Sequence, residues 1–320
     1  MIVFASISVV SGCANAVNPR LAYNSGASDI RTAQHSLGRW TTRAPMPTAR
    51  ADLAAAVING ILYAVGGWND QGIVNTVEAY DPATDTWATK APMPTARYGL
   101  AIGVINGELY AVGGRDQLDP LNSVEEYNPA TNTWTVKAPM HAARTNLAVG
   151  VIKRILYAVG GDNGTAYLRK VEAYDPTTNK WTIKARMPTA RSWLAAGVVN
   201  DRLTVVGGWT PFTGPLNRVE VYDPVVNGWT HGASMPTARY GLAAGVISGR
   251  LYAVGGCCDS NFQLLNEVEA YDPATNHWTV KAFMPTARYE LAAGVVNGRL
   301  YAVGGDDGSP LNTVEAFNPL

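Results

Sequence analysis

The dipeptide Gly-Gly recurs six times in this chain at an almost constant interval. The doublets begin at residues 66, 113, 160, 207, 255 and 304, so the intervals between them are 47, 47, 47, 48 and 49 residues. A repeat of this period indicates an architecture in which each copy is one supersecondary unit. Residues shared by all copies therefore build the scaffold, and residues that differ between copies are the candidates for a specific site.

Each copy carries the signals of four short antiparallel strands. In the second copy the expected strands are residues 100–105, 108–112, 124–127 and 134–137. Asn106-Gly107 between the first two is a strong hairpin signal, because a type I′ turn needs two positive φ values. Four strands per unit, with a turn every 8–12 residues or so, predict an all-β fold and exclude a helical solenoid.

Small residues dominate the first strand of each copy, as in Ala54-Ala55-Ala56 and Ala195-Ala196-Gly197. Sheets arranged radially crowd together at their axis, so slim side chains indicate that this strand is the innermost. A tyrosine on the second strand and a tryptophan on the fourth recur in nearly every copy. We expect these rings to fill the wider space between sheets further out.

The order of these elements resembles the kelch repeat. Gly-Gly, Val-Glu-Ala-Tyr-Asp-Pro, a tryptophan and Met-Pro-Thr-Ala-Arg follow one another along residues 39–320. The resemblance implies a six-bladed β-propeller with one four-stranded antiparallel sheet per blade. The sixth copy stops after its third strand, whereas Trp40 precedes the first Gly-Gly. We therefore expect the N-terminal segment around Trp40 to supply the fourth strand of the last blade and to cover its open edge.

One arginine ends each Met-Pro-Thr-Ala-Arg loop or its equivalent, and one glutamate opens each third strand. The arginines are Arg50, Arg97, Arg144, Arg191, Arg239 and Arg288, and the glutamates are Glu78, Glu125, Glu172, Glu220, Glu269 and Glu315. They form either buried pairs of the scaffold or an anion-binding ring near the axis. Their presence in every copy favours the scaffold interpretation.

The copies differ most in the segments that follow the Gly-Gly and the arginine. The kelch resemblance implies that ligands bind on the face built by these two sets of loops. The expected ligand-binding residues are Trp68, Arg115, Asp162, Trp209 and Asp306 after the glycines, and Tyr98, Asn146, Trp193, Tyr240 and Tyr289 after the arginines. Flat aromatic faces beside carboxylates and amides suit a glycan, and they equally suit an extended peptide.

The leading functional hypothesis is a binding module for a glycan or a peptide. One alternative, from the fold-level resemblance, is a carbohydrate-active enzyme such as a sugar-acid mutarotase or epimerase. Its candidate catalytic residues are Glu290 or Asp52 together with Arg115. A second alternative is a pure protein-interaction scaffold. The sequence contains neither Gly-x-Ser-x-Gly nor His-Glu-x-x-His, and we predict no cofactor and no metal site.

The N-terminus suggests export. Residues 1–10 are almost wholly apolar and run into Val10-Ser11-Gly12-Cys13, which resembles a bacterial lipobox, although no Lys or Arg precedes it. We expect a signal-like or lipoprotein-like leader and tether over residues 1–38, a lipid anchor at Cys13 and an extracytoplasmic location, with the propeller over residues 39–320. No apolar stretch is long enough for a transmembrane helix. The 25 basic and 25 acidic residues give a formal net charge of zero and include no Lys/Arg run, so a nucleic-acid partner is not expected.

Overall fold

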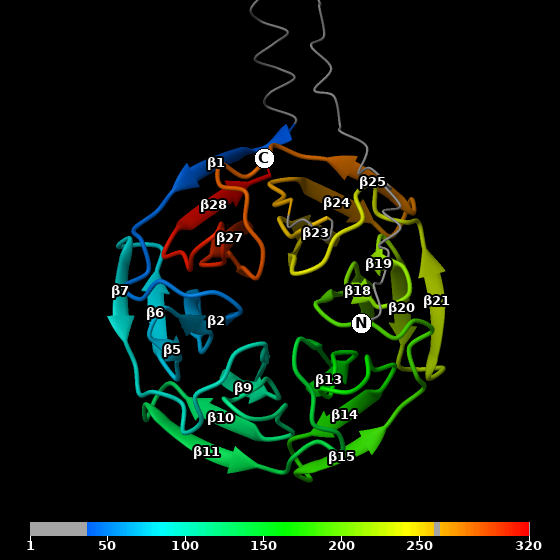
Figure 1. Cartoon of the computed structure of the whole chain (residues 1–320), viewed down its shortest axis with the longest axis horizontal. Coiled ribbons are helices and arrows are strands. Elements are labelled where there is room, and N and C mark those ends of the chain that lie inside the picture. The colour runs from blue at the N-terminus through cyan, green and yellow to red at the C-terminus, as the bar shows by residue number, and fades with distance from the viewer. Residues whose placement is uncertain (1–36, 259–262, 320) are drawn as a thin grey trace, which may run out of the picture.

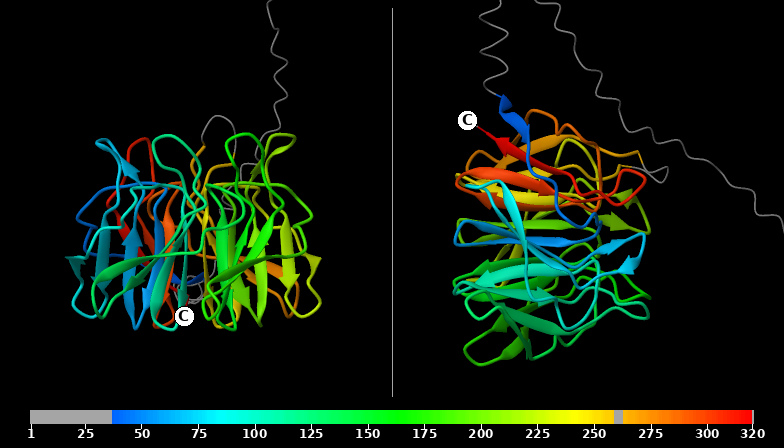
Figure 2. Two further views of the ribbon diagram at one scale, coloured as in Figure 1. Left: turned by 90° about the horizontal axis from the view of Figure 1, so that it is seen from below. Right: turned by 90° about the vertical axis from the view of Figure 1, so that its left-hand side faces the viewer.

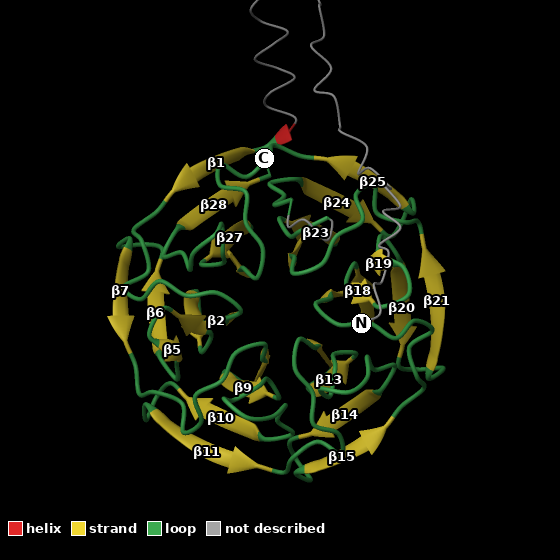
Figure 3. Cartoon of the chain, viewed as in Figure 1, coloured by secondary structure: helices red, strands yellow, loops and turns green. Residues whose placement is uncertain are grey.

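The computed structural model describes residues 37–258 and 263–319. Every named element within them is a β-strand, and apart from one helical residue, Leu37, the strands are joined by loops and turns (Figure 3). The strands form six four-stranded antiparallel sheets around a central axis (Figure 1). The predicted six-bladed propeller is confirmed.

Residues 1–36, which include Cys13, lie outside the described residues, so the leader and the lipid anchor stay predictions. Among the described residues, no helical segment has the length and apolar character needed to span a bilayer.

Each blade has four strands in order from the axis outwards. Blade 1 contains β2 (Ala54–Ile58), β3 (Ile61–Val65), β6 (Val77–Asp81) and β7 (Thr86–Thr89). Blade 2 contains β8 (Ala101–Ile105), β9 (Glu108–Val112), β10 (Val124–Asn128) and β11 (Thr133–Lys137). Blade 3 contains β12 (Ala148–Ile152), β13 (Ile155–Val159), β14 (Val171–Asp175) and β15 (Lys180–Ile183).

The second half of the ring repeats this order. Blade 4 contains β16 (Ala195–Val199), β17 (Arg202–Val206), β20 (Val219–Asp223) and β21 (Gly228–Gly232). Blade 5 contains β22 (Ala243–Ile247), β23 (Arg250–Val254), β24 (Val268–Asp272) and β25 (His277–Val280). Blade 6 contains β26 (Ala292–Val296), β27 (Arg299–Val303), β28 (Val314–Asn318) and β1 (Arg39–Thr42). Two small hairpins were not expected: β4 (Trp68–Asn69) with β5 (Gly72–Ile73), and β18 (Trp209–Thr210) with β19 (Gly214–Pro215).

The small residues of the innermost strands have a packing cause. A Cβ added to Gly150 in β12 would lie 2.3 Å from the side chain of Leu203, in the second strand of the next blade. Five of the six innermost strands have glycine at this central position, and in each of them a leucine of the next blade fills the space. Adjacent blades therefore pack directly against one another near the axis.

The seam of the ring is closed as the sequence predicts. Strand β1 lies beside β28 (Figure 1) and pairs with it antiparallel, so that Trp40 lies opposite Phe317. The centroids of these two rings are 5.2 Å apart, and the Trp40 indole Nε1 donates a hydrogen bond to the Ala282 carbonyl at 2.8 Å. The prediction that the segment around Trp40 completes the last blade is confirmed.

The third strand of every blade carries an aromatic residue, which is a tyrosine in blades 1 to 5 and a phenylalanine in blade 6. In blades 1 to 5 its tyrosine hydroxyl donates to an Asn or Asp five residues later, in the turn before the fourth strand, as Tyr127 does to Asn132 at 2.7 Å. In blade 6 the fourth strand comes from the other end of the chain, so this turn is absent. The residue there is Phe317, which has no hydroxyl to satisfy.

The six repeated arginines are structural. Each guanidinium is fully buried and pairs with the glutamate of its own blade; the N–O distance is 2.7 Å for Arg50–Glu78 and 2.8 Å for Arg191–Glu220. Burial lowers the pKa of Arg191 to about 10, so this arginine stays charged at neutral pH. The structure supports the scaffold interpretation, because each guanidinium is buried within its blade and paired with a glutamate there.

Candidate functional site

The structure brings the two variable loop sets together on one face of the propeller. The residue after each repeated arginine pairs with the residue after a Gly-Gly through backbone hydrogen bonds. The pairs are Ala51–Trp68, Tyr98–Arg115, Thr145–Asp162, Ser192–Trp209, Tyr240–Cys257 and Tyr289–Asp306. We call these twelve residues the outer ring. Figure 2 shows loops and the small hairpins extending from one side of the propeller.

The next residue along each arginine loop lies closer to the axis. These six residues, here called the inner ring, are Asp52, Gly99, Asn146, Trp193, Gly241 and Glu290. The N–H of each donates to the carbonyl of its counterpart in the preceding blade, at 2.7 to 3.0 Å, and the bond from Asp52 to Glu290 completes the circle. The six backbones are thus held alike while their side chains differ.

All six inner-ring residues have φ between 51° and 61°. Glycine adopts this left-handed conformation freely, and Asn and Asp tolerate it, but it costs other L-residues roughly 1–2 kcal/mol. Blades 2 and 5 have glycine there, so the scaffold accepts a residue without a side chain. Blades 4 and 6 instead hold Trp193 and Glu290. Strain of this kind is a reason to look for function.

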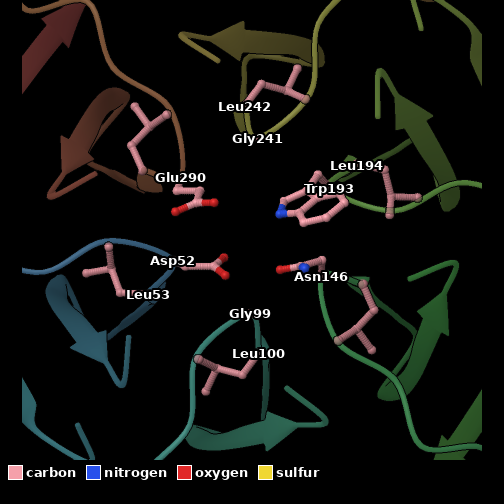
Figure 4. A pocket seen from close by; sticks show the side chains of 12 residues that line it. Asp52, Leu53, Gly99, Leu100, Asn146, Trp193, Leu194, Gly241, Leu242 and Glu290 are labelled. Carbon is pink, nitrogen blue, oxygen red and sulfur yellow. The ribbon is translucent and has the colours of Figure 1, made fainter. Parts of the chain in front are cut away.

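The inner ring surrounds a pocket of about 120 Å³ at the mouth of the central channel (Figure 4). The pocket is lined by the inner ring and by the six leucines that follow it: Leu53, Leu100, Leu147, Leu194, Leu242 and Leu291. Four polar or aromatic side chains reach toward the axis. The Asp52 and Glu290 carboxyls lie on one side, facing the Asn146 amide and the Trp193 indole, and the two glycines leave gaps between these pairs (Figure 4).

A short hydrogen-bonded chain joins three of these side chains. In the carboxamide orientation that suits its neighbours, Asn146 donates from Nδ2 to Asp52 Oδ2 at 3.1 Å and accepts at Oδ1 from Trp193 Nε1 at 3.3 Å. The Asn146 side chain is buried and also fills the space beside Gly99, where an added Cβ would lie 2.5 Å from the end of its carboxamide. Asn146 therefore orients Asp52 and Trp193 around the pocket.

The two pocket carboxyls are destabilised as anions. Desolvation is the main reason that the pKa of Glu290 rises to about 7; a hydrogen bond from Trp68 opposes the rise, and the charge of Asp306 adds to it. Desolvation also raises the pKa of Asp52 well above its usual range, with further contributions from Glu290 and Asp162. Such shifts inside a pocket are typical of functional carboxyls.

Aromatic rings line the opposite side of the mouth. The Trp193 ring lies 6.2 Å from Tyr240 and 6.5 Å from Tyr167, and Tyr240 contacts Trp209 at 5.0 Å between centroids. Ser192 donates from Oγ to Asp162 Oδ2 at 2.9 Å and fixes that carboxylate in the outer ring. The mouth thus has an acidic side in blades 6 and 1 and an aromatic side in blades 3 to 5.

The predicted residues divide between the two rings. Asn146 and Trp193 line the pocket, as do the catalytic candidates Asp52 and Glu290. The outer ring holds Trp68, Tyr98, Arg115, Asp162, Trp209, Tyr240, Tyr289 and Asp306. Arg115 is not a lining residue, and its Nη2 donates to the Leu118 carbonyl of its own loop at 3.3 Å.

Sequence reasoning missed Gly99, Gly241 and Tyr167. Aligning the second residue after each arginine would have identified the two glycines, because they occupy the same repeat position as Asp52 and Glu290. Within residues 37–258 and 263–319, no three His, Cys, Asp or Glu side chains are grouped so as to hold a metal ion.

Family models match most of the chain. The model described as the KLHDC2/KLHL20/DRC7 Kelch-repeats domain matches residues 85–208 and 146–320, and the Kelch motif matches residues 49–94. The chain belongs to the kelch-repeat family. This kelch propeller is also similar to a solved structure titled "Structure of YjhT", with a TM-score of 0.73 and 18% identity over 85% of this chain and 95% of that one. That likeness concerns the fold. Among curated proteins, none matches the sequence of this chain.

Proposed function

We propose that this kelch propeller is a binding module that takes a glycan or a peptide at the mouth of its central channel. The inner ring carries the proposal. Its six positions share one backbone conformation and one circle of hydrogen bonds, yet they hold aspartate, glycine, asparagine, tryptophan, glycine and glutamate. A position that only maintained the fold would need no such variety, whereas convergent polar groups in a pocket are typical of ligand sites.

The experiment is a thermal-shift screen of glycans and peptides against the wild-type chain and Trp193→Ala. A ligand of this site should raise the melting temperature of the wild type, since binding to the folded state alone stabilises it, and should lose its effect on the variant. Phe283→Ala is the matched control, because its ring is half exposed and does not line the pocket. A ligand that stabilises Trp193→Ala as well as the wild type would place binding elsewhere.

A second candidate function is catalysis on a sugar acid, by a mutarotase or epimerase reaction. One observation favours it: the pKa of Glu290 is raised to about 7, where a carboxyl can both give and take a proton near neutral pH. In this role Glu290 and Asp52 would give a proton to the sugar acid and take one from it. Arg115 would have to move from its contact with Leu118 to hold the acid.

Nuclear magnetic resonance can test the catalytic candidate directly. The chain would be added to a panel of sugar acids at anomeric equilibrium, and the exchange rate between anomers or epimers would be measured. Catalysis predicts faster exchange with the wild type, and no acceleration with Glu290→Gln or Asp52→Asn. If the wild type does not change the exchange rate of any sugar acid in the panel, the catalytic candidate fails and only the binding function remains.

A further inference from the structure

The charge of the channel mouth is unbalanced. Two carboxyls line the pocket and none of its lining residues is basic. Asp306 and Asp162 of the outer ring add to this negative field, because both act on the pocket carboxyls. Arg115 is the one basic residue of the outer ring, so the two rings together hold four carboxyls and one cation. The six repeated arginines cannot neutralise the excess, since each is paired with a glutamate of its blade. A concave site of one sign favours a ligand of the opposite sign.

The size of the pocket limits what can enter it. Pockets that enclose a drug-sized ligand measure roughly 300–1,000 Å³, and a cavity of roughly 150 Å³ holds one benzene. The pocket of about 120 Å³ therefore admits an end group of side-chain size, and the rest of the ligand must lie over the outer ring.

The wall opposite the carboxyls suits an organic cation. Trp193 lies among Tyr167 and Tyr240, and an ammonium or guanidinium group is attracted to such rings as well as to carboxylates. An organic cation can therefore contact both the carboxyls and the rings of this mouth.

Two exposed apolar side chains lie at tips of the loop set that follows the glycines. Phe212 is 89% exposed at the tip of the β18–β19 hairpin, and Leu118 is 76% exposed in the loop that begins at Arg115. They belong to blades 4 and 2, on either side of blade 3. Exposed apolar side chains that stand singly are common on protein surfaces, so these two do not identify a partner by themselves; they are apolar contacts available to a ligand that already lies over this face.

We propose that the occupant of the channel mouth is the cationic side chain of a peptide segment, an arginine or a lysine, whose apolar neighbours contact Phe212 and Leu118. The inference rests on the proposed function and narrows it. The Asp52 and Glu290 carboxyls receive the cation, whose charge favours their ionised forms, Trp193 packs on its aliphatic stem, and the peptide backbone lies across the outer ring.

The test is selection from a displayed library of random dodecapeptides on the full chain. Selected peptides should contain an arginine or lysine beside large apolar residues. Fluorescence anisotropy should then show affinity falling at least tenfold when that residue is replaced by citrulline or acetyl-lysine, which remove the charge without altering the propeller. The double variant Asp52→Asn, Glu290→Gln should lose a similar factor, whereas the exposed control Asp70→Asn should bind as the wild type does.

Three results would overturn the proposal: selection of neutral or acidic peptides, selection of none, or equal affinity for the citrulline and arginine forms. If a glycan array instead gives a ligand that depends on Trp193, the binding function stands and the basic-peptide inference fails. If peptides and glycans both fail to bind, the binding function fails with it.

Discussion

At the scale of single residues, Glu290 combines two unfavourable features. Its backbone has a φ of 53°, and its carboxyl has a pKa raised to about 7 beside Asp306. Neither feature helps the blade to fold, since Gly241 occupies the same ring position in blade 5 without either cost. The inner ring therefore keeps a carboxyl that the scaffold alone would not need.

Replacing this carboxyl should change the pH dependence of stability. The pKa of Glu290 in the folded chain is above its ordinary value of 4.5, so the ionised group opposes folding above about pH 7, and this penalty fades as pH falls toward 4.5. Glu290→Gln should thus melt higher than the wild type at pH 8 and nearly equally at pH 5. The measurement is thermal unfolding at both values. The same difference at both would contradict the raised pKa.

The buried arginines should respond differently. Arg191→Ala leaves Glu220 buried without its 2.8 Å partner, so we expect a loss of about 3–5 kcal/mol in the free energy of unfolding. Denaturant titration measures this loss, and the exposed Arg218→Ala should cost under about 0.5 kcal/mol. An Arg191→Ala chain of unchanged stability that no longer bound its ligand would restore the anion-ring interpretation.

At the scale of elements, the seam depends on β1. This strand covers β28 and brings Trp40 onto Phe317, while the Leu37 carbonyl accepts from the Ala282 N–H at 2.9 Å. In the other blades, an Asn or Asp of the turn before the fourth strand accepts the corresponding bond, as Asn276 does from Ala233. Blade 6 therefore makes this hydrogen bond with a backbone carbonyl, where the other blades use a side chain.

Deleting residues 39–44 should destabilise the whole ring, because it exposes Phe317 and leaves β28 as an open edge. We expect the melting temperature to fall and the unfolding transition to broaden. Thermal unfolding followed by circular dichroism measures both. A deletion variant that melts as the full chain does would mean that the seam contributes little.

A gentler change tests the packing at the seam. Gly38 has a φ of 89°, and an added Cβ would lie 2.4 Å from the Phe317 ring. Gly60 has a φ of 81° with nothing within 4 Å of the added atom, so Gly60→Ala carries the backbone strain alone. Gly38→Ala should be more destabilising by roughly 1–3 kcal/mol, the usual cost of overpacking, in denaturant titrations of both variants. Equal losses would argue against close packing there.

At the scale of the whole molecule, the fold was readable from the sequence because its signals repeat. Asn106-Gly107 marked the hairpin between β8 and β9, and Trp40 marked the missing strand of blade 6; both lie where expected. The expected strand at residues 100–105 begins one residue later, at Ala101. The two small hairpins were missed because they lie in loops that differ between copies.

The site was predicted less completely, for a conformational reason. Which residue after the arginine points to the axis depends on the sign of φ. Trp193 and Glu290 give no hint of the left-handed conformation that they adopt, so the sequence could not separate the inner ring from Tyr98, Tyr240 and Tyr289 of the outer ring. The ring of backbone hydrogen bonds, which no sequence signal marks, is what places Gly99 and Gly241 at the pocket.

The central claim is that shared residues build this propeller and that the inner ring makes its site. Its most direct test is one chain in which Asp52, Asn146, Trp193 and Glu290 are all replaced by glycine, as in blades 2 and 5. The measurement is the melting temperature of this chain and of the wild type, each with and without a ligand of the wild type. We predict a similar melting temperature without ligand, because glycine accepts φ near 51°, and no ligand-induced shift. A chain that fails to fold, or that is still stabilised by the ligand, would contradict the account.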